Sequence, residues 1–290
     1  MVFEHWMAKA GGNLIQFLVG LDVVAHVEVA EIALKAFFEK IPNMLEGNFT
    51  DQFLQSMTAE MAFTLRAYCE HQIASTRSTE IVTEILPELS VMNEYLRAKY
   101  DAIVTCSDDV VRAELEFVLN ELLKVCNWLD FSDEVGRRAV FDTCQEIMSN
   151  LEICDAVYEQ CIKLLTKHSS NTEEFLNLMT TFISSFRDVY ELSPTTAAAN
   201  QDPADELIDN YIPDDVRIMA NLKALEIVRS VLCASGEAIT FARFPILVAY
   251  LDEIVIPSVN SQFAAVQAAG LVCLGLCCTI EKVRTNRLTE

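Results

Sequence analysis

The histidines and carboxylates of this chain do not form the pairs that catalysis or metal binding requires. The four histidines are far apart, and none has a second ligand three or four residues further along: they are His5, His26, His71 and His168. Glu114 and Glu116 are close in sequence, but residues i and i+2 of a helix do not face each other. The sequence also lacks the motifs GxSxG, HExxH and DxDxDG and a glycine-rich phosphate loop. We therefore expect no enzyme activity, no cofactor and no metal site.

The ten cysteines form no metal-binding or disulfide pattern. Five of them stand singly at positions with the helical spacing of a core: Cys69, Cys126, Cys144, Cys161 and Cys273. No CxxC occurs, and Cys277 and Cys278 are adjacent on a predicted helix, where they are poorly placed to chelate one metal. We expect buried, reduced thiols in a cytosolic or nuclear protein rather than a zinc site or a disulfide framework.

Two small basic groups are the candidates for a contact with DNA or with a partner. Arg137 and Arg138 begin a predicted helix, and Arg112 stands near the start of the preceding long helix. The second group, Lys282, Arg284 and Arg287, lies at the C-terminal end. Each group has a structural alternative: an arginine after a motif valine bonds to the preceding repeat, and C-terminal cations complement the helix dipole or are solvated.

The charge of the whole chain disfavours nucleic-acid binding by these residues alone. The sequence has 43 acidic and 21 basic residues, for a formal net charge of −22. Binding to phosphates requires a basic stripe that releases counterions, and a strongly acidic surface repels them. The acidic surface serves solubility or receives a basic protein partner.

The sequence predicts neither a cleavable signal nor a membrane span. Glu4 and His5 precede any apolar run, and the longest such run, Ala268 to Cys278, is shorter than the about 20 residues that a bilayer requires. We expect a soluble, intracellular protein that does not contact membranes.

The scarcity of Gly and Pro indicates an all-α protein. Only 8 Gly and 7 Pro occur, and the prolines fall at the edges of periodic segments. Apolar periodicity predicts helices over residues 2–21, 27–38, 78–86, 91–104, 107–129, 154–167, 172–190, 216–233, 246–255 and 262–282, with others that start at the cap Thr58 and at Val135.

Residues 244–282 show how these helices are expected to pack. Ile246, Tyr250 and Ile254 share one helical face, Pro257 is predicted to end that helix, and residues 258–261 form a polar turn. The second helix has small residues on one side, which permit close approach of another helix. Because this hairpin is apolar on both sides, it must stack on neighbours before and after it, which is the basis of α-solenoids.

The hairpins resemble HEAT repeats, in which an apolar helix and a turn precede a Val-Arg-x-x-small pattern. Val111-Arg112 and Val135-Gly136-Arg137-Arg138 follow this pattern, whereas Val266 is followed by Gln267 where Arg is usual. The prediction is an α-solenoid of HEAT-like hairpins in a right-handed superhelical array. Repeats are expected over residues 1–192 and 216–290, separated by a flexible acidic loop at 193–215 that is rich in Pro, Ala and Asp.

Longer segments resemble one family more specifically, the condensin HEAT-repeat subunit of the CAP-G type, also called condensin complex subunit 3. They occur in the same order as in that family and cover nearly the whole chain: Trp6, Gly12-Asn13, 21–23, Leu65, Cys69-Glu70, 85–87, Tyr95-Leu96, 129–138, 254–259 and 271–278. The chain is similar to a middle-to-C-terminal portion of such subunits.

The resemblance implies a non-enzymatic regulatory subunit of condensin. It would bind the kleisin subunit and, through it, the SMC ATPase subunits, and would support DNA loop formation and mitotic chromosome condensation. The implied location is the nucleus and chromosome, with a cytoplasmic pool. DNA contact is expected mainly through the complete subunit, and Arg112, Arg137 and Arg138 are the candidate contact residues. The alternative is a generic acidic HEAT or armadillo adaptor that binds basic peptides in transport or assembly.

Overall fold

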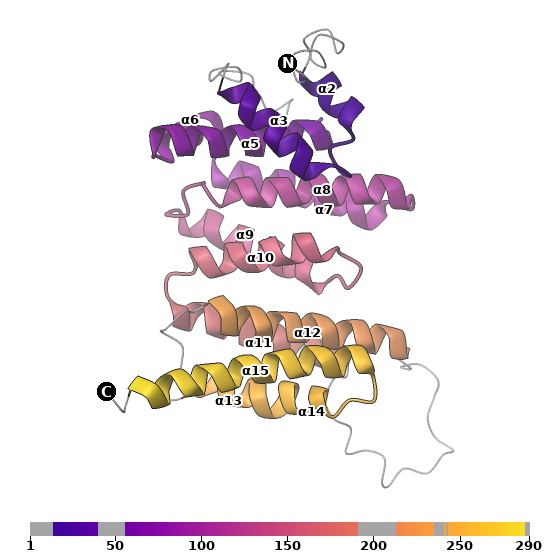
Figure 1. The fold of residues 1–290 in the computed structure, drawn as a ribbon, viewed down its shortest axis with the longest axis vertical. Coiled ribbons are helices and arrows are strands. Elements are labelled where there is room, and N and C mark those ends of the chain that lie inside the picture. The colour runs from indigo at the N-terminus through magenta and orange to yellow at the C-terminus, as the bar shows by residue number, and fades with distance from the viewer. Residues whose placement is uncertain (1–13, 40–55, 191–212, 235–240, 242, 288–290) are drawn as a thin grey trace. The chain divides into compact units, whose positions relative to one another are not determined.

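The computed structural model describes residues 14–39, 56–190, 213–234, 241 and 243–287, and every regular element in these ranges is helical (Figure 1). The chain divides into two compact units, Met1–His168 and Ser169–Glu290. The predicted all-α fold is therefore confirmed. The handedness of the array remains a prediction, and so does the division at 192 and 215, since residues 191–212 lie outside the described residues.

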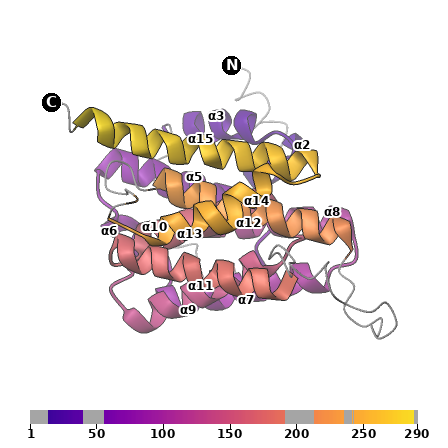
Figure 2. The ribbon, with the colours of Figure 1, turned by 90° about the horizontal axis from the view of Figure 1, so that it is seen from below.

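The first unit is built from stacked helical hairpins. Its described helices are α2 (Leu14–Leu21), α3 (Val27–Phe38), α5 (Ala59–Thr76), α6 (Glu80–Ile85), α7 (Leu89–Thr105), α8 (Asp109–Cys126), α9 (Glu134–Ser149) and α10 (Asp155–His168). Helices α7 and α8 form one hairpin and α9 and α10 the next, with α9 packed along α7 and α10 along α8. Figure 2 shows α7 and α9 together in one layer of this unit. Each described hairpin is thus covered by its neighbour, as solenoid packing requires.

The described residues of the second unit form two hairpins. Its helices are α11 (Thr172–Tyr190), α12 (Asp214–Ala234), α13 (Ile246–Tyr250), a π-helical segment η3 (Leu251–Val255), α14 (Ile256–Val259) and α15 (Ala264–Arg287). Helices α11 and α12 form the first hairpin, and α12 packs along α15 of the second. Asp214 and Asp215 lie in the first turn of α12, where acidic side chains favour the positive end of the helix dipole.

Side-chain caps fix the starts of three helices of the first unit. The Thr58 hydroxyl accepts from the Met61 N–H at 3.4 Å, which confirms that cap. The Asp108 carboxylate accepts from the Val110 and Val111 amides at 2.9 and 3.2 Å. Asp133 binds Val135 and Gly136 in the same way at 3.1 and 2.9 Å. Such caps satisfy amides that have no partner within the helix, so short polar residues determine where α5, α8 and α9 begin.

The prediction that Pro257 ends a helix is wrong. The helix continues through Pro257 to Val259, and the preceding turn widens into the π segment η3, where Ile256 N–H donates to Leu251 O. A proline inside a regular α-helix collides with the carbonyl four residues earlier, and the wider π turn accommodates its ring. Ser258 and Val259 are consequently helical, although the sequence predicted them in a turn.

The core of each unit is aliphatic and aromatic, with buried thiols. The five cysteines predicted at core positions are all buried, and the ten cysteines of the chain are all free thiols. The pKa of the Cys69 thiol is raised to about 12, mainly by burial and further by the negative charge of neighbouring Glu70. The Cys69 thiol is therefore protonated at neutral pH, and the five buried cysteines pack as small apolar side chains. In the described part of the chain, no helix is both long and apolar enough to cross a membrane.

Candidate contact sites

Arg137 and Arg138 differ in exposure although they are adjacent. The Arg137 side chain is 9% exposed, and its Nε and Nη2 both lie 2.8 Å from Glu134 Oε2. Its guanidinium carbon also lies 5.1 Å from the centre of the Phe141 ring. The Arg138 side chain is 75% exposed and its Nε donates to Glu134 Oε1 at 2.6 Å. Only Arg138 of this pair is open to a partner.

Glu134 neutralises part of the charge of the arginine pair. Hydrogen bonds from Arg137 and then from Arg138 lower the pKa of this carboxyl. It is therefore ionised at neutral pH, so the start of α9 presents two guanidinium groups against one carboxylate, with Asp133 as the N-cap beside them. This arrangement is weaker as a phosphate site than the sequence pair Arg-Arg suggests.

Arg112 stabilises the turn between α7 and α8. Its Nη2 donates to Cys106 O, the carbonyl of the C-cap residue of α7, at 2.9 Å. Its Nη1 lies 3.5 Å from Glu152 Oε2, and its Nε is buried without a hydrogen-bond acceptor among the described residues. Gln267, which occupies the corresponding motif position in α15, donates to Val259 O at 3.1 Å. Arg and Gln thus perform the same function here, which is to satisfy a carbonyl at the end of the preceding helix.

The structure does not bring Arg112 together with the arginine pair. Arg112 lies beside Tyr100 and Ile103 near the C-terminal end of α7. Gly136, next to Arg137, is close to Leu89 at the opposite end of α7, since a Cβ at Gly136 would lie 3.4 Å from Leu89 Cδ2. Helix α7 has 17 residues, which corresponds to roughly 24 Å. The three candidate residues therefore form two separate sites.

The remaining sequence candidates contribute little to a site. Lys282, Arg284 and Arg287 fall in α15, but their side chains lie outside what the structure describes, as does His5. The other histidines are found on separate elements. Within the described residues, no three His, Cys, Asp or Glu side chains lie close enough together to hold a metal ion.

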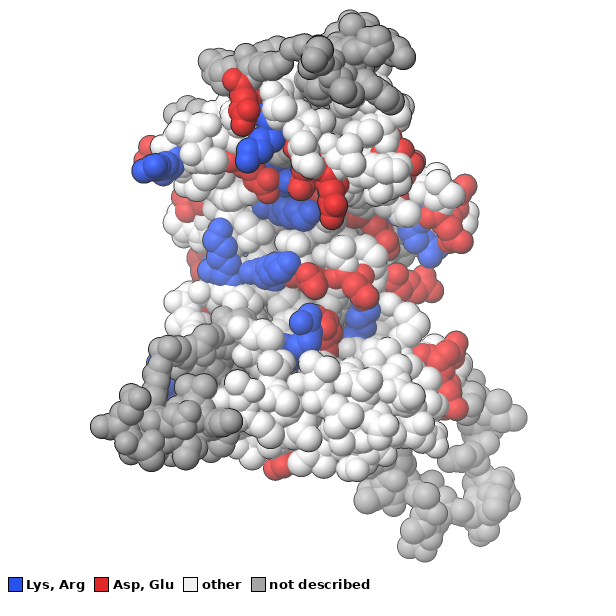
Figure 3. Space-filling model, in the orientation of Figure 1, with Lys and Arg blue, Asp and Glu red and all other residues white. Residues whose placement is uncertain are grey.

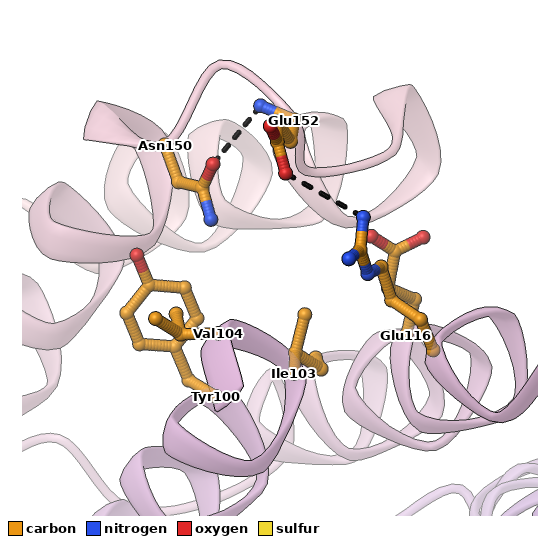
Figure 4. A pocket seen from close by; sticks show the side chains of 7 residues that line it. Tyr100, Ile103, Val104, Glu116, Asn150 and Glu152 are labelled. Carbon is orange, nitrogen blue, oxygen red and sulfur yellow. Dashed lines mark hydrogen bonds and ion pairs between the residues drawn. The ribbon is translucent and has the colours of Figure 1, made fainter. Parts of the chain in front are cut away.

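A cavity of about 320 Å³ lies at the Arg112 end of α7. It is lined by Tyr100, Ile103, Val104, Arg112, Glu116, Asn150 and Glu152. Figure 4 shows Tyr100, Ile103 and Val104 on one side, and Asn150 and Glu152, from the turn between α9 and α10, on the other. Asn150 Oδ1 accepts from the Glu152 N–H at 2.9 Å, which leaves the amide nitrogen of Asn150 facing the cavity. No local sequence pattern predicts this cavity, because the residues that line it come from two different hairpins.

Sequence reasoning also missed a buried charge network centred on Arg66. Arg66 on α5 donates to Glu121 on α8, to Glu70 on its own helix and to Glu31 on α3, at 2.6, 2.8 and 2.8 Å. Lys124 Nζ completes the network at 2.7 Å from Glu121. In the sequence, Arg66 stands between the buried Leu65 and the buried Tyr68 and Cys69. A charged residue among core positions was therefore the sequence signal that could have revealed this network.

The outer face of α15 is exposed and uncharged from Ala264 to Thr279, the part whose side chains the structure describes. Leu271 and Val272 are 53% and 54% exposed, and the exposed positions around them are held by Ala264, Ala265, Gln267, Ala268, Gly275, Cys278 and Thr279. Figure 3 shows a mostly uncharged surface where α12 and α15 lie. A solvated helix face normally carries charged residues, so this face has the composition of a contact surface.

The stacked hairpins and their turn-capping residues define the class of the protein, an α-solenoid of HEAT-like repeats. Within this class, residues 223–288 match the family model described as nuclear condensing complex subunits, C-terminal domain. The resemblance to condensin complex subunit 3 is confirmed by similarity to curated proteins of that name. The one from Schizosaccharomyces pombe is 25% identical over 97% of this chain and 35% of its own length.

Two further relatives and one solved structure show the same similarity. Condensin complex subunit 3 of Saccharomyces cerevisiae is 26% identical over 65% of this chain and 19% of that protein. The Homo sapiens protein is 24% identical over 70% of this chain and 21% of its own length. The fold matches a chain in the crystal structure of the S. pombe condensin Cnd3-Cnd2 subcomplex, with a TM-score of 0.76, 23% identity, and coverage of 94% of this chain and 34% of that chain. The chain thus spans about a third of the length of the S. pombe relative and of the matched chain of the subcomplex, and about a fifth of the S. cerevisiae and H. sapiens relatives.

Proposed function

We propose that this chain forms part of a regulatory, non-enzymatic subunit of condensin and binds a segment of the kleisin subunit. The observation that carries the proposal is the similarity to condensin complex subunit 3 along 97% of the chain. A long, continuous match of this kind involves the whole set of stacked hairpins rather than one repeat. Solenoids bind partners on extended surfaces made by successive repeats, which suits a flexible kleisin segment.

The finer activities of the complex are part of the same proposal. Bound to the kleisin and, through it, to the SMC ATPase subunits, the complete subunit would support DNA loop formation and mitotic chromosome condensation. It would act in the nucleus and on chromosomes, with a cytoplasmic pool. The solved Cnd3-Cnd2 subcomplex supports the proposed binding to the kleisin, since the neighbouring fold was crystallised with a second condensin subunit.

Affinity purification from dividing cells tests the proposal. The tagged chain is expected to retain kleisin and SMC subunits, as measured by quantitative mass spectrometry against a tag-only control. Recovery of transport cargo without kleisin or SMC subunits would favour the adaptor alternative and refute the proposal. A second arm co-expresses the chain with recombinant kleisin, because direct binding then shows as co-elution in size-exclusion chromatography.

A further inference from the structure

The cavity between the α7–α8 turn and the α9–α10 turn has an apolar wall of defined size. Ile103 and Tyr100 are buried, whereas Val104 is 57% exposed, so this wall reaches from the core to the surface. A volume of about 320 Å³ is at the lower end of the range for ligand pockets. The space therefore suits one apolar side chain with part of its backbone better than an extended ligand.

The guanidinium group of Arg112 forms a fixed polar part of the cavity wall. The Nε–H of Arg112 is buried without an acceptor among the described residues. Its two terminal nitrogens are occupied by Cys106 O and by Glu152, which hold the guanidinium in place. Because this Nε–H is inaccessible, a ligand in the cavity does not pair with it, and the guanidinium acts on a ligand only through its charge.

The charge of the cavity selects a cation beside the apolar group. Two carboxylates, Glu116 and Glu152, line it against the single guanidinium of Arg112. Exposed aspartates occur on the same helix ends, at Asp101 in α7 and Asp109 in α8. Nearby cations are engaged elsewhere, since Arg97 binds Glu146 and Lys99 donates to Met57 O. A ligand that brings a positive charge is therefore favoured, and a phosphate is repelled.

We infer that this cavity binds a short segment of another protein in which an apolar side chain is followed by Lys or Arg. The apolar side chain lies against Val104 and Ile103, and the cation of the segment faces Glu152 and Glu116. The inference goes beyond kleisin binding and does not depend on it, because it rests on the chemistry of the cavity alone. It assigns a recognition role to the turns of the solenoid.

Peptide binding measured by fluorescence anisotropy tests the inference. The probe is a labelled ten-residue peptide with a central Leu-Lys-Arg flanked by Gly and Ser. One control peptide carries Leu-Glu-Glu and another Ser-Lys-Arg, and a labelled duplex DNA is the third probe. The intact chain is expected to bind the first probe at least about fivefold more tightly than any of the others.

Two variants locate the binding at the cavity. Glu152→Lys reverses a charge on a 75% exposed side chain, and its matched control is Glu253→Lys, which also removes an ion pair to an arginine from an exposed glutamate. Val104→Trp fills the mouth of the cavity, with Val29→Trp as the control at a similarly exposed valine of α3. Each cavity variant should weaken binding about fivefold or more, and each control less than twofold. Equal affinity for the acidic peptide, preference for DNA, or equal loss in a cavity variant and its control would overturn the inference.

Discussion

The guanidinium of Arg66 donates its Nε–H to Glu121 Oε2 at 2.6 Å, and thereby connects α5 to α8 across 55 residues of sequence. Both side chains are almost fully buried, with 4% and 1% exposed. Burial disfavours the charged form of Arg66 and by itself lowers the pKa of this residue. The negative charges of Glu121, and then of Glu70 and Glu31, outweigh the effect of burial and raise the pKa of Arg66 above its usual value. Arg66 therefore stays charged in the folded protein.

Removing one member of this pair should destabilise the first unit strongly. Arg66→Met leaves Glu121 buried with Lys124 and Asn120 as its hydrogen-bond partners among the described residues, and a broken buried ion pair costs about 3–5 kcal/mol. The double variant Arg66→Met, Glu121→Leu should recover most of that loss, since no buried charge is then left unpaired. Urea denaturation followed by circular dichroism measures both. A loss below about 1 kcal/mol in the single variant would show that solvent reaches the pair.

Two glycines of α15 should respond in opposite directions to substitution by alanine. A Cβ at Gly270 would lie 2.9 Å from the backbone N of Val259, so Gly270→Ala forces α14 and α15 apart. A Cβ at Gly275 meets nothing within 4 Å. Gly275→Ala should therefore stabilise the chain, by up to about 1 kcal/mol, through helix propensity. Thermal unfolding of the two variants side by side provides the comparison, and a Gly270→Ala chain as stable as the parent would contradict the described packing.

His168 should make the stability of the first unit depend on pH. Its ring stacks on Phe131 with ring centres 3.7 Å apart. Burial first, and then the charge of Lys167, lower the pKa of His168 from 6.5 to about 4. The unfolded chain therefore binds the proton more readily than the folded one. The contribution of the neutral ring is fully present above pH 6.5 and is lost as the pH falls toward 4.

The variant His168→Phe isolates this effect because it keeps an aromatic ring against Phe131 and removes the titrating group. The difference in free energy of unfolding between parent and variant should shift in favour of the variant between pH 7.5 and pH 5. Urea denaturation at both pH values measures it. A difference that stays constant over this interval would show that the histidine titrates normally in the fold.

The sequence predicted those features that depend on local spacing. The bounds of α3 and α11 agree with the predicted ranges, since apolar periodicity and flanking polar residues determine both ends. Pro257 was misjudged because a π turn, which has no sequence pattern of its own, accommodates it. The arginine pair was predicted as one site, but helix geometry buries Arg137 and exposes Arg138. The cavity and the Arg66 network join residues from different hairpins, so only the packed structure reveals them.

The chain alone should bind duplex DNA weakly or not at all near physiological salt. Log affinity falls by about 0.9 per phosphate contact for each tenfold rise in salt, so tight binding requires several unpaired cations on one face. The chain has 43 acidic against 21 basic residues. Arg112 and Arg137 are engaged in hydrogen bonds with protein groups, and their side chains are 30% and 9% exposed.

Gel shifts at about 0.15 M salt test this expectation, with Arg138→Glu as the variant. Arg138 is 75% exposed, so its reversal changes the surface without burying a charge, whereas Arg137→Glu would place a carboxylate in a buried site beside Glu134. Arg97→Glu is the matched control, since Arg97 is 54% exposed and is also paired with a glutamate. No shift is expected for the parent or either variant. Tight binding by the parent that Arg138→Glu abolishes and Arg97→Glu retains would show that Arg138 contacts DNA despite the acidity of the chain.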